Sequence, residues 1–179
     1  MILALACSGS SARHPYPFRS GDRMVYAWQD PSGVRIVRIF IVEAEGDGFV
    51  VRRRQRVEAP NGEFAEKALS LSEKVYDKFG RLLRLADGRS GSRSKGHYCF
   101  LWLNPDMRKS GVRVPIAEAA EPSRPLVEET RDGRFCLILR IGNGEWIYDQ
   151  QTGYLTDGKG LGRLLESPAG VTSNVIKVN

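Results

Sequence analysis

The sequence lacks the residue patterns by which most enzymes are recognised. It contains two histidines in 179 residues, and the motifs His-Glu-x-x-His, Gly-x-Ser-x-Gly and Gly-Lys-Ser/Thr are absent. His14 lies in a proline-flanked stretch, so His97 is the one candidate for an imidazole base. We identify no catalytic residue, no cofactor site and no metal site, and a hydrolase with an unrecognised site is kept only as an alternative.

Long apolar runs are also absent. No stretch approaches the roughly 20 apolar residues that a membrane-spanning helix needs, and 41% hydrophobic with 27% charged residues is ordinary for a globular chain. A length of 179 residues allows one sizeable core, which predicts a single domain. Nineteen glycines and nine prolines, most of them between short apolar runs, indicate many turns and therefore many strands.

Three apolar segments near the start of the chain predict an antiparallel meander. The segments are Arg23–Gln29, Val34–Glu43 and Phe49–Val57. Each is rich in β-branched and aromatic residues, which favour strands. The connections Asp30–Gly33 and Glu45–Gly48 carry the proline, glycine and aspartate that tight turns require.

The second half of the chain predicts further strands. Residues 63–79 fit both helical and strand spacing, and we favour strand because the next residues resemble a hairpin corner. His97–Leu103 alternates as a strand does, and Leu126–Thr130 with Arg134–Ile141 predicts a hairpin. The segment Ile116–Ala120 is compatible with one short helical turn. A further hairpin is expected at Gly158–Gly162, and strands are expected at Trp146–Tyr148 and in the tail through Val175–Val178.

The apolar pattern of the second segment predicts curvature. Ile36, Phe40 and Val42 fall on one face of a strand, whereas Val37, Ile39 and Ile41 fall on the other. A strand that is apolar on both faces needs cover on both sides, which a sheet curved over a helix, a loop or an apolar cavity supplies. The predicted fold class is therefore all-β, a curved antiparallel sheet or half-barrel with at most one short helix.

Three cysteines bear on the cellular compartment. Cys7 follows six apolar residues, while Cys99 and Cys136 lie inside the chain on predicted strands. If those strands are neighbours, a Cys99–Cys136 disulfide is sterically available, as expected of an exported protein. The alternative is two reduced cysteines packed as small hydrophobes. Metal binding by His97, Cys99 and Cys136 is not favoured, because a lone His-x-Cys is too short a pattern to indicate a site.

An arginine run suggests an anion-binding surface. In a strand, Arg52, Arg54 and Arg56 project from one face at intervals of about 7 Å, and the whole chain carries a net charge of +6. Such a row suits phosphates of nucleic acid or anionic lipid headgroups, or is simply a solvated face protected against aggregation. Nucleic acid is the less favoured partner, because sheets that bind it interleave aromatic residues and this row has none.

Two motifs resemble those of a group of bacterial proteins. The stretch Tyr16-Pro-Phe-Arg-Ser-Gly-Asp-Arg-Met-Val-Tyr26 resembles the start of many uncharacterised secreted proteins and lipoproteins, and Trp146-Ile-Tyr-Asp-Gln-Gln-Thr-Gly-Tyr-Leu155 is similar to their end. Such proteins resemble the curved antiparallel half-barrels of the lipoprotein-carrier type, whose sheet wraps an apolar cavity. The resemblance implies a place in the cell envelope and an apolar or lipid ligand, and it transfers no catalytic residue.

The first residues are interpreted in the same way. Met1 to Ala6 form a six-residue apolar run with no basic residue, which is shorter than the core of a complete signal peptide. We interpret residues 1–18 as the truncated end of a lipoprotein signal with a tether, with Cys7 as the lipid acceptor, and residues 19–179 as one β domain. The predicted protein is a non-catalytic binding or scaffolding protein, lipid-anchored in the bacterial periplasm. A cytoplasmic nucleic-acid-binding β protein is the alternative.

Overall fold

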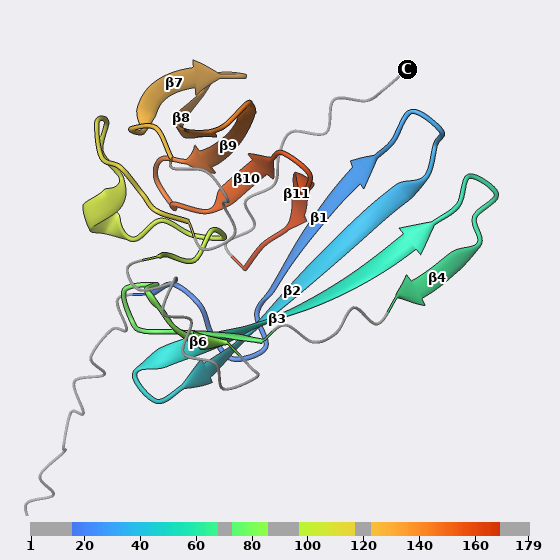
Figure 1. The fold of residues 1–179 in the computed structure, drawn as a ribbon, viewed down its shortest axis with the longest axis horizontal. Helices are drawn as coiled ribbons and strands as arrows, with labels where there is room; N and C mark the ends of the chain where they lie inside the picture. Colours follow the sequence, from blue (N-terminus) through green and yellow to red (C-terminus); the bar gives the residue numbers. More distant parts are fainter. Residues whose placement is uncertain (1–15, 68–72, 86–96, 117–122, 169–179) are drawn as a thin grey trace, which may run out of the picture.

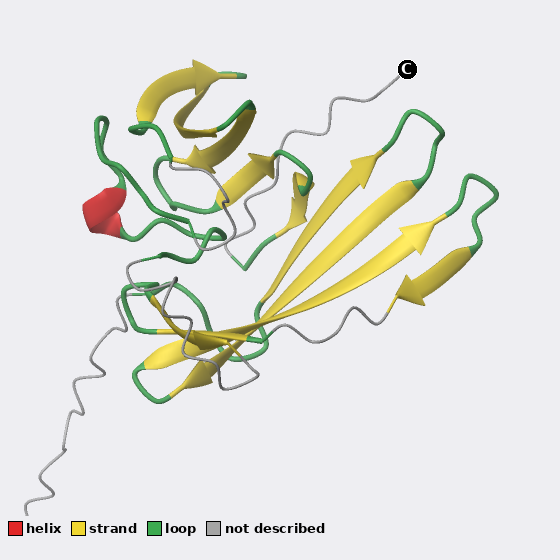
Figure 2. Cartoon of the chain, viewed as in Figure 1, coloured by secondary structure: helices red, strands yellow, loops and turns green. Residues whose placement is uncertain are grey.

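The computed structural model describes residues 16–67, 73–85, 97–116 and 123–168, and it contains one antiparallel sheet. Figures 1 and 2 show the sheet curving from a long, splayed group of strands to a second group of short strands. The predicted all-β class is therefore confirmed. The one helix of the described ranges is the 3-10 turn η1 (Pro105–Met107). The strands are β1 (Arg23–Gln29), β2 (Arg35–Glu45), β3 (Gly48–Glu58), β4 (Phe64–Lys67), β5 (Lys74–Tyr76), β6 (Leu82–Leu85), β7 (Val127–Arg131), β8 (Arg134–Ile141), β9 (Gly144–Asp149), β10 (Leu155–Gly158) and β11 (Gly162–Glu166).

The sheet consists of two meanders that meet at β1. Its strand order is β6-β5-β3-β2-β1-β11-β10-β9-β8-β7, and β4 pairs with the far end of β3. β1 therefore pairs with the next strand in the chain on one side and with the last described strand on the other. The sheet is not closed, since β6 and β7 end the strand order without pairing to each other in the described ranges.

Turn chemistry explains where the strands end. Between β1 and β2, a carboxylate oxygen of Asp30 accepts hydrogen bonds from the backbone N–H groups of Ser32 and Val34. Between β7 and β8, Asp132 and Gly133 both have positive φ angles, of 50° and 74°. That combination is the turn geometry that matches the twist of a two-residue hairpin. Both turns agree with the sequence prediction.

The core lies on one face of the sheet, here called the inner face. It is filled by the crossing segment, residues 97–104, which runs over this face between the two meanders. The prediction of a strand at His97–Leu103 is wrong, because only isolated bridges occur there, at Tyr98 and Trp102. Five consecutive residues, Cys99 to Leu103, are buried, so the segment packs on all sides instead of alternating between two faces.

The two faces of β2 differ in how well they are covered. Phe40 and Val42 belong to the core of the inner face. On the outer face, cross-strand register sets Val37, Ile39 and Ile41 opposite Arg56, Arg54 and Arg52 of β3. The aliphatic stems of arginines can shield apolar neighbours while the guanidinium groups reach water. The core therefore covers the inner face, whereas on the outer face Val37 is buried but Ile39 and Ile41 stay partly exposed.

Several other predictions can be compared with the structure. Residues 63–79 form strands where they are described, β4 and β5, and the hairpin at Gly158–Gly162 is present. On β8, Leu137 and Leu139 are core residues, whereas Phe135 is 71% exposed. Tyr16 and Phe18 are buried in the core. The expected helical turn at 116–120 and the tail strand at 175–178 lie almost wholly outside the described residues, and Ile116 itself forms a bridge with Tyr98.

Candidate ligand-binding pocket

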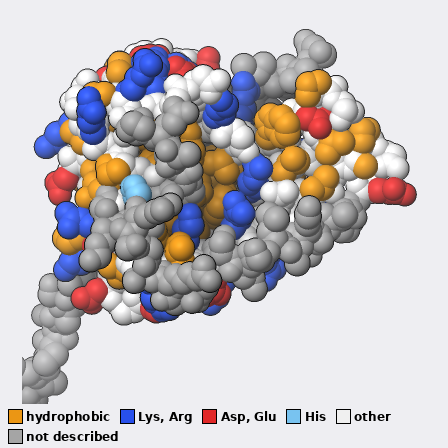
Figure 3. Space-filling view, viewed as in Figure 1, with side chains coloured by type: hydrophobic (Ala, Val, Ile, Leu, Met, Phe, Trp, Pro, Cys, Tyr) orange, Lys and Arg blue, Asp and Glu red, His pale blue; other side chains and the backbone are white. Residues whose placement is uncertain are grey.

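A pocket of about 220 Å³ opens on the inner face, where the two meanders approach each other. Figure 3 shows apolar side chains gathered at the centre of this view, with basic side chains beside them. Strands β2, β3, β5 and β9, the crossing segment and the β10–β11 turn all contribute to its wall. The described residues that line it are Arg38, Phe40, Val51, Arg53, Lys74, Tyr76, Phe100, Trp146, Lys159, Gly160 and Leu161.

Aromatic rings form the apolar part of the pocket. Phe100 of the crossing segment makes edge contacts with Phe40 of β2, at 5.3 Å between ring centroids, and with Trp146 of β9, at 5.5 Å. The three rings come from three distant parts of the chain, and their edge-to-face packing fixes their positions. Trp146 is only partly buried. The pocket therefore offers a preformed apolar surface that solvent can reach.

Basic side chains form the rest of the lining. Arg38, Arg53, Lys74 and Lys159 line the pocket, and none of its described lining residues is acidic. The partners of Arg38 are neutral: its Nε donates to Oε1 of Gln55 at 3.3 Å, and its Nη1 donates to the carbonyl of Gly160. Lys159 likewise donates from Nζ to Oδ1 of Asn143. Among the described residues, Arg38 and Lys159 thus bind neutral dipoles rather than carboxylates.

Cross-strand register places two arginines together inside the fold. Arg38 lies opposite Gln55, and Arg53 lies opposite Phe40, so the two arginines are diagonal neighbours on the inner face. The Nε of Arg53 is buried and has no hydrogen-bond partner among the described residues. The pKa of Arg38 is lowered, first by burial and then by the positive charge of Arg53. The unpaired Nε of Arg53 and the lowered pKa of Arg38 both indicate that no negative charge of the described residues lies between the two guanidinium groups.

The predicted arginine row occupies the opposite face of β3. Arg52, Arg54 and Arg56 lie on the outer face, as expected from strand periodicity. Arg52 is bound by two carboxylates: its Nε lies 2.6 Å from Oε1 of Glu73, and its Nη1 also contacts Glu43. The row is therefore partly neutralised, and Arg54 is its exposed member. Anion binding by this row stays a prediction.

Sequence reasoning missed the basic residues of the pocket. A signal for Arg38 was present, because it interrupts the apolar face made by Ile36, Phe40 and Val42. Arg53 could not be distinguished from the other arginines of the run by residue type. Its odd position in the strand nevertheless places it on the same face as Val51 and not with Arg52, Arg54 and Arg56. A charged residue on the apolar face of a strand is the pattern that indicates this site. Lys74 and Lys159 carried no comparable signal.

The predicted disulfide is not present. Cys99 and Cys136 are not joined by a disulfide, and both are buried. The expectation depended on two neighbouring strands, but Cys99 lies in the crossing segment, where its N–H donates to the carbonyl of Gly80. On β8, Leu137 and Leu139 face the core that contains Cys99, so Cys136 lies on the other face of the sheet. There the Cys136 thiol donates to the carbonyl of Arg134, with 3.6 Å between Sγ and oxygen.

The other candidate residues do not assemble a catalytic centre. The Nδ1 of His97 is buried and has no hydrogen-bond partner among the described residues, so no carboxylate orients the ring. Over the same ranges, no three His, Cys, Asp or Glu side chains are grouped so as to hold a metal ion. Cys7 lies outside the described residues.

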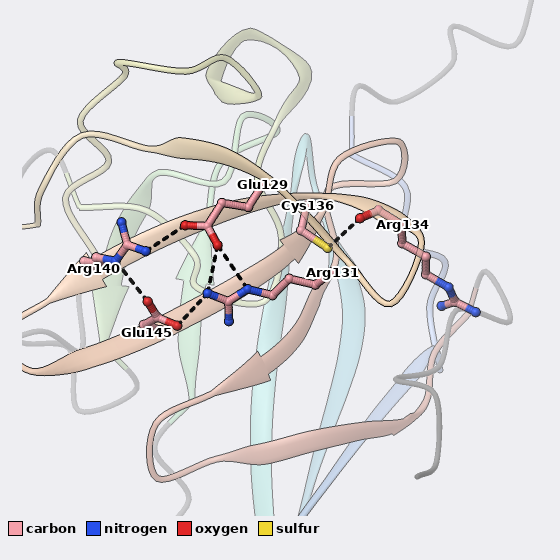
Figure 4. Close-up of polar contacts among 6 residues, drawn as sticks. All are labelled: Glu129, Arg131, Arg134, Cys136, Arg140 and Glu145. Carbon is pink, nitrogen blue, oxygen red and sulfur yellow. Dashed lines mark hydrogen bonds and ion pairs between the residues drawn. The ribbon is translucent and has the colours of Figure 1, made fainter.

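A closed ring of four charges lies on the outer face of β7, β8 and β9. Figure 4 shows Glu129 between Arg131 and Arg140, with Glu145 completing the ring. The four nitrogen-to-oxygen distances are between 2.7 and 3.0 Å. Hydrogen bonds from the two arginines lower the pKa of both carboxyl groups. Because each charge is matched, the ring joins three strands and leaves no excess charge for a ligand.

Comparisons with known proteins give no relative. No protein-family model matches the chain, and no curated protein or solved structure matches it. Among the described residues, no helix has the length and apolar character of a membrane span. Functional inference therefore depends on the pocket itself.

Proposed function

We propose that this chain is a non-catalytic binding protein that holds an apolar molecule in the inner-face pocket. The observation that carries the proposal is the aromatic lining, in which the partly exposed Trp146 packs with the buried rings of Phe40 and Phe100. Ligand sites are typically concave, mostly apolar and largely preformed, with a few polar groups that orient the ligand. The arrangement of rings and basic groups fits that description.

The size of the pocket limits the ligand. A volume of about 220 Å³ corresponds to about seven water molecules at about 30 Å³ each. A single alkyl chain or a small ring system is of that size, whereas a complete two-chain lipid is larger. The proposed ligand is therefore a small or single-chain molecule.

The proposed place of action is the bacterial envelope, with Cys7 as the lipid acceptor. This part of the proposal depends on the sequence, namely the apolar residues before Cys7 and the tether-like residues after it. Expression from the native locus, with its upstream DNA, tests it. Labelled fatty acid should be incorporated into the protein, and Cys7→Ser should abolish the labelling; a cytoplasmic, unlabelled protein would contradict it.

Bromine quenching of tryptophan fluorescence tests the binding function. The ligand is 10-bromodecan-1-ol, an uncharged chain whose bromine quenches only nearby indoles. We expect saturable quenching of the wild type that is lost in Trp146→Phe, because phenylalanine keeps the pocket apolar but removes the reporter. Trp28→Phe is the matched control, since Trp28 is 41% exposed and does not line the pocket.

Two results would contradict the proposal. Absence of saturable quenching would indicate a scaffold without an apolar ligand. Quenching that persists in Trp146→Phe and disappears in Trp28→Phe would place the ligand elsewhere on the sheet.

A further inference from the structure

The basic groups of the pocket identify a narrower class of ligand. We infer that the occupant is a single-chain amphiphile whose carboxylate or phosphate group lies between Arg38 and Arg53 while its alkyl chain contacts Phe100 and Trp146. The inference rests on the binding function proposed above, and it adds the charge and the orientation of the ligand.

The first argument is the charge balance. Within the described part of the chain, Arg38, Arg53 and Lys159 make no ion pair with any carboxylate. On the outer face, by contrast, Arg52, Arg131 and Arg140 all bind acidic partners. Positive charge is therefore left unpaired where the pocket opens, and an anionic group supplies the missing partner.

The second argument is an unsatisfied donor. The Nε of Arg53 is buried and has no hydrogen-bond partner in the described ranges, and a buried donor that lacks an acceptor is costly. An oxyanion accepts several hydrogen bonds and pairs readily with guanidinium groups. A carboxylate or phosphate at this position would therefore satisfy a group that the protein itself leaves unsatisfied.

The third argument is the relation between the two arginines. As diagonal neighbours on paired strands, Arg38 and Arg53 have backbones about 7–8 Å apart. Long side chains at that separation reach a common ligand atom between them. The charge of Arg53 already disfavours the charged form of Arg38, so an anion between the two groups removes a repulsion as well as adding two attractions.

The fourth argument is the position of the apolar surface. Phe40 follows Arg38 by two residues on the same face of β2 and packs against Phe100. The basic groups and the rings are therefore adjacent parts of one pocket rather than two separate sites. A molecule with an anionic head and an apolar chain contacts both parts at once, whereas a free anion contacts only the first.

A set of ligands with one chain and different head groups tests the inference. We would measure binding of decanoate, decyl phosphate, decan-1-ol and decyltrimethylammonium by isothermal titration calorimetry, below their critical micelle concentrations. Decanoate and decyl phosphate should bind at least tenfold more tightly than decan-1-ol, and decyltrimethylammonium should bind most weakly. Added salt should reduce the advantage of the anions.

Adjacent residues of β3 provide matched variants. Arg53→Gln should remove most of the advantage of decanoate over decan-1-ol, because it weakens decanoate binding far more than decan-1-ol binding. Arg54→Gln removes the same charge from the outer face and should change neither affinity. If Arg53→Gln does not fold, Arg38→Gln takes its place. The comparison of head groups is made on the wild-type protein and so does not depend on either variant.

The outcomes separate this inference from the proposed function. Equal affinities for decanoate and decan-1-ol would overturn the inference and leave the binding function intact. Inorganic phosphate that binds as tightly as decyl phosphate would overturn it in favour of a site for free anions. Failure of all four chain ligands to bind would overturn both.

Discussion

The hydroxyl of Tyr26 on β1 donates a 2.8 Å hydrogen bond to the carbonyl of Leu155 on β10. The bond spans 129 residues of sequence and reaches past β11, which pairs with β1 in the sheet. Tyr26 is fully buried, and burial is the main reason that its pKa is raised well above the usual value. The contact therefore joins the two meanders from within the core, where the pocket is formed.

Removing this hydrogen bond should destabilise the fold. Tyr26→Phe keeps the ring and its contact with Phe40 but leaves the Leu155 carbonyl without that donor. We expect a loss of about 1–2 kcal/mol in the free energy of unfolding, measured by urea denaturation. Tyr98→Phe is the control, because its hydroxyl bonds Arg81 at the exposed surface, and its cost should be below about 0.5 kcal/mol. If both variants lose the same free energy of unfolding, then the buried hydrogen bond contributes no more to stability than the exposed one.

The close approach of Gly162 to β1 gives a second stability prediction. Its φ angle is +84°, and a Cβ added there would lie 1.9 Å from the carbonyl oxygen of Ala27. Gly162→Ala should therefore separate β11 from β1 and cost about 3 kcal/mol or more in the free energy of unfolding. Gly160, in the same hairpin, has a φ of +76° but open space around its Cβ position.

The Gly160→Ala variant isolates the steric part of that cost. It should lose only about 1–2 kcal/mol, the penalty of the left-handed conformation for alanine. Urea denaturation of both variants measures the difference. If the two variants lose the same free energy, then the backbone conformation alone explains the effect and the contact with Ala27 is unimportant.

The β-hairpins could be predicted from the sequence, but the crossing segment could not. Turn residues fix the hairpins locally, as at Asp30 and at Asp132-Gly133, so alternation between two such turns is enough to identify β1 to β3. The segment after His97 has the same alternating pattern as those strands. Its conformation is decided by distant contacts, such as the hydrogen bond from the N–H of Leu103 to the carbonyl of Gly153. No local pattern contains that information.

The candidate site shows the same limit. Periodicity correctly placed Arg52, Arg54 and Arg56 on one face, but it could not show that Glu73 and Glu43 bind Arg52. Strand parity alone also separates Arg53 from its neighbours, because adjacent residues point to opposite faces. Which face is the inner one becomes known only when the second meander packs against the first. The pocket is therefore a product of tertiary structure.

The charged ring predicts a specific dependence of stability on pH. The folded pKa values of Glu129 and Glu145 lie below their usual range, because Arg131 and Arg140 bind their charged forms. Their stabilising contribution is therefore present above the unfolded pKa of about 4.3 and is lost as the pH falls through the folded values. Glu145→Gln should be less stable than the wild type at pH 7, and the difference should shrink as the pH approaches 3.

Urea denaturation at pH 7, 5 and 3 measures this effect. Glu166→Gln at the exposed end of β11 is the control, because Glu166 makes no ion pair with a described residue. Its difference from the wild type should be small at every pH. A Glu145→Gln difference that stays constant between pH 7 and pH 3 would show that the ring does not titrate with folding.

The lack of a disulfide between Cys99 and Cys136 predicts that stability does not depend on reducing agent. A disulfide between Cys99 and Cys136 would add about 3–4 kcal/mol by constraining the unfolded chain, but the two thiols are not bonded to each other and lie on opposite faces of the sheet. Thermal unfolding should therefore give the same Tm with and without dithiothreitol, and Cys136→Ser should be equally insensitive to it. Both thiols should react with iodoacetamide slowly in the folded protein and rapidly in urea, since both are buried and burial raises the pKa of Cys136. A lower Tm in dithiothreitol, seen in the wild type but not in Cys136→Ser, would instead show that the two cysteines are bonded in solution.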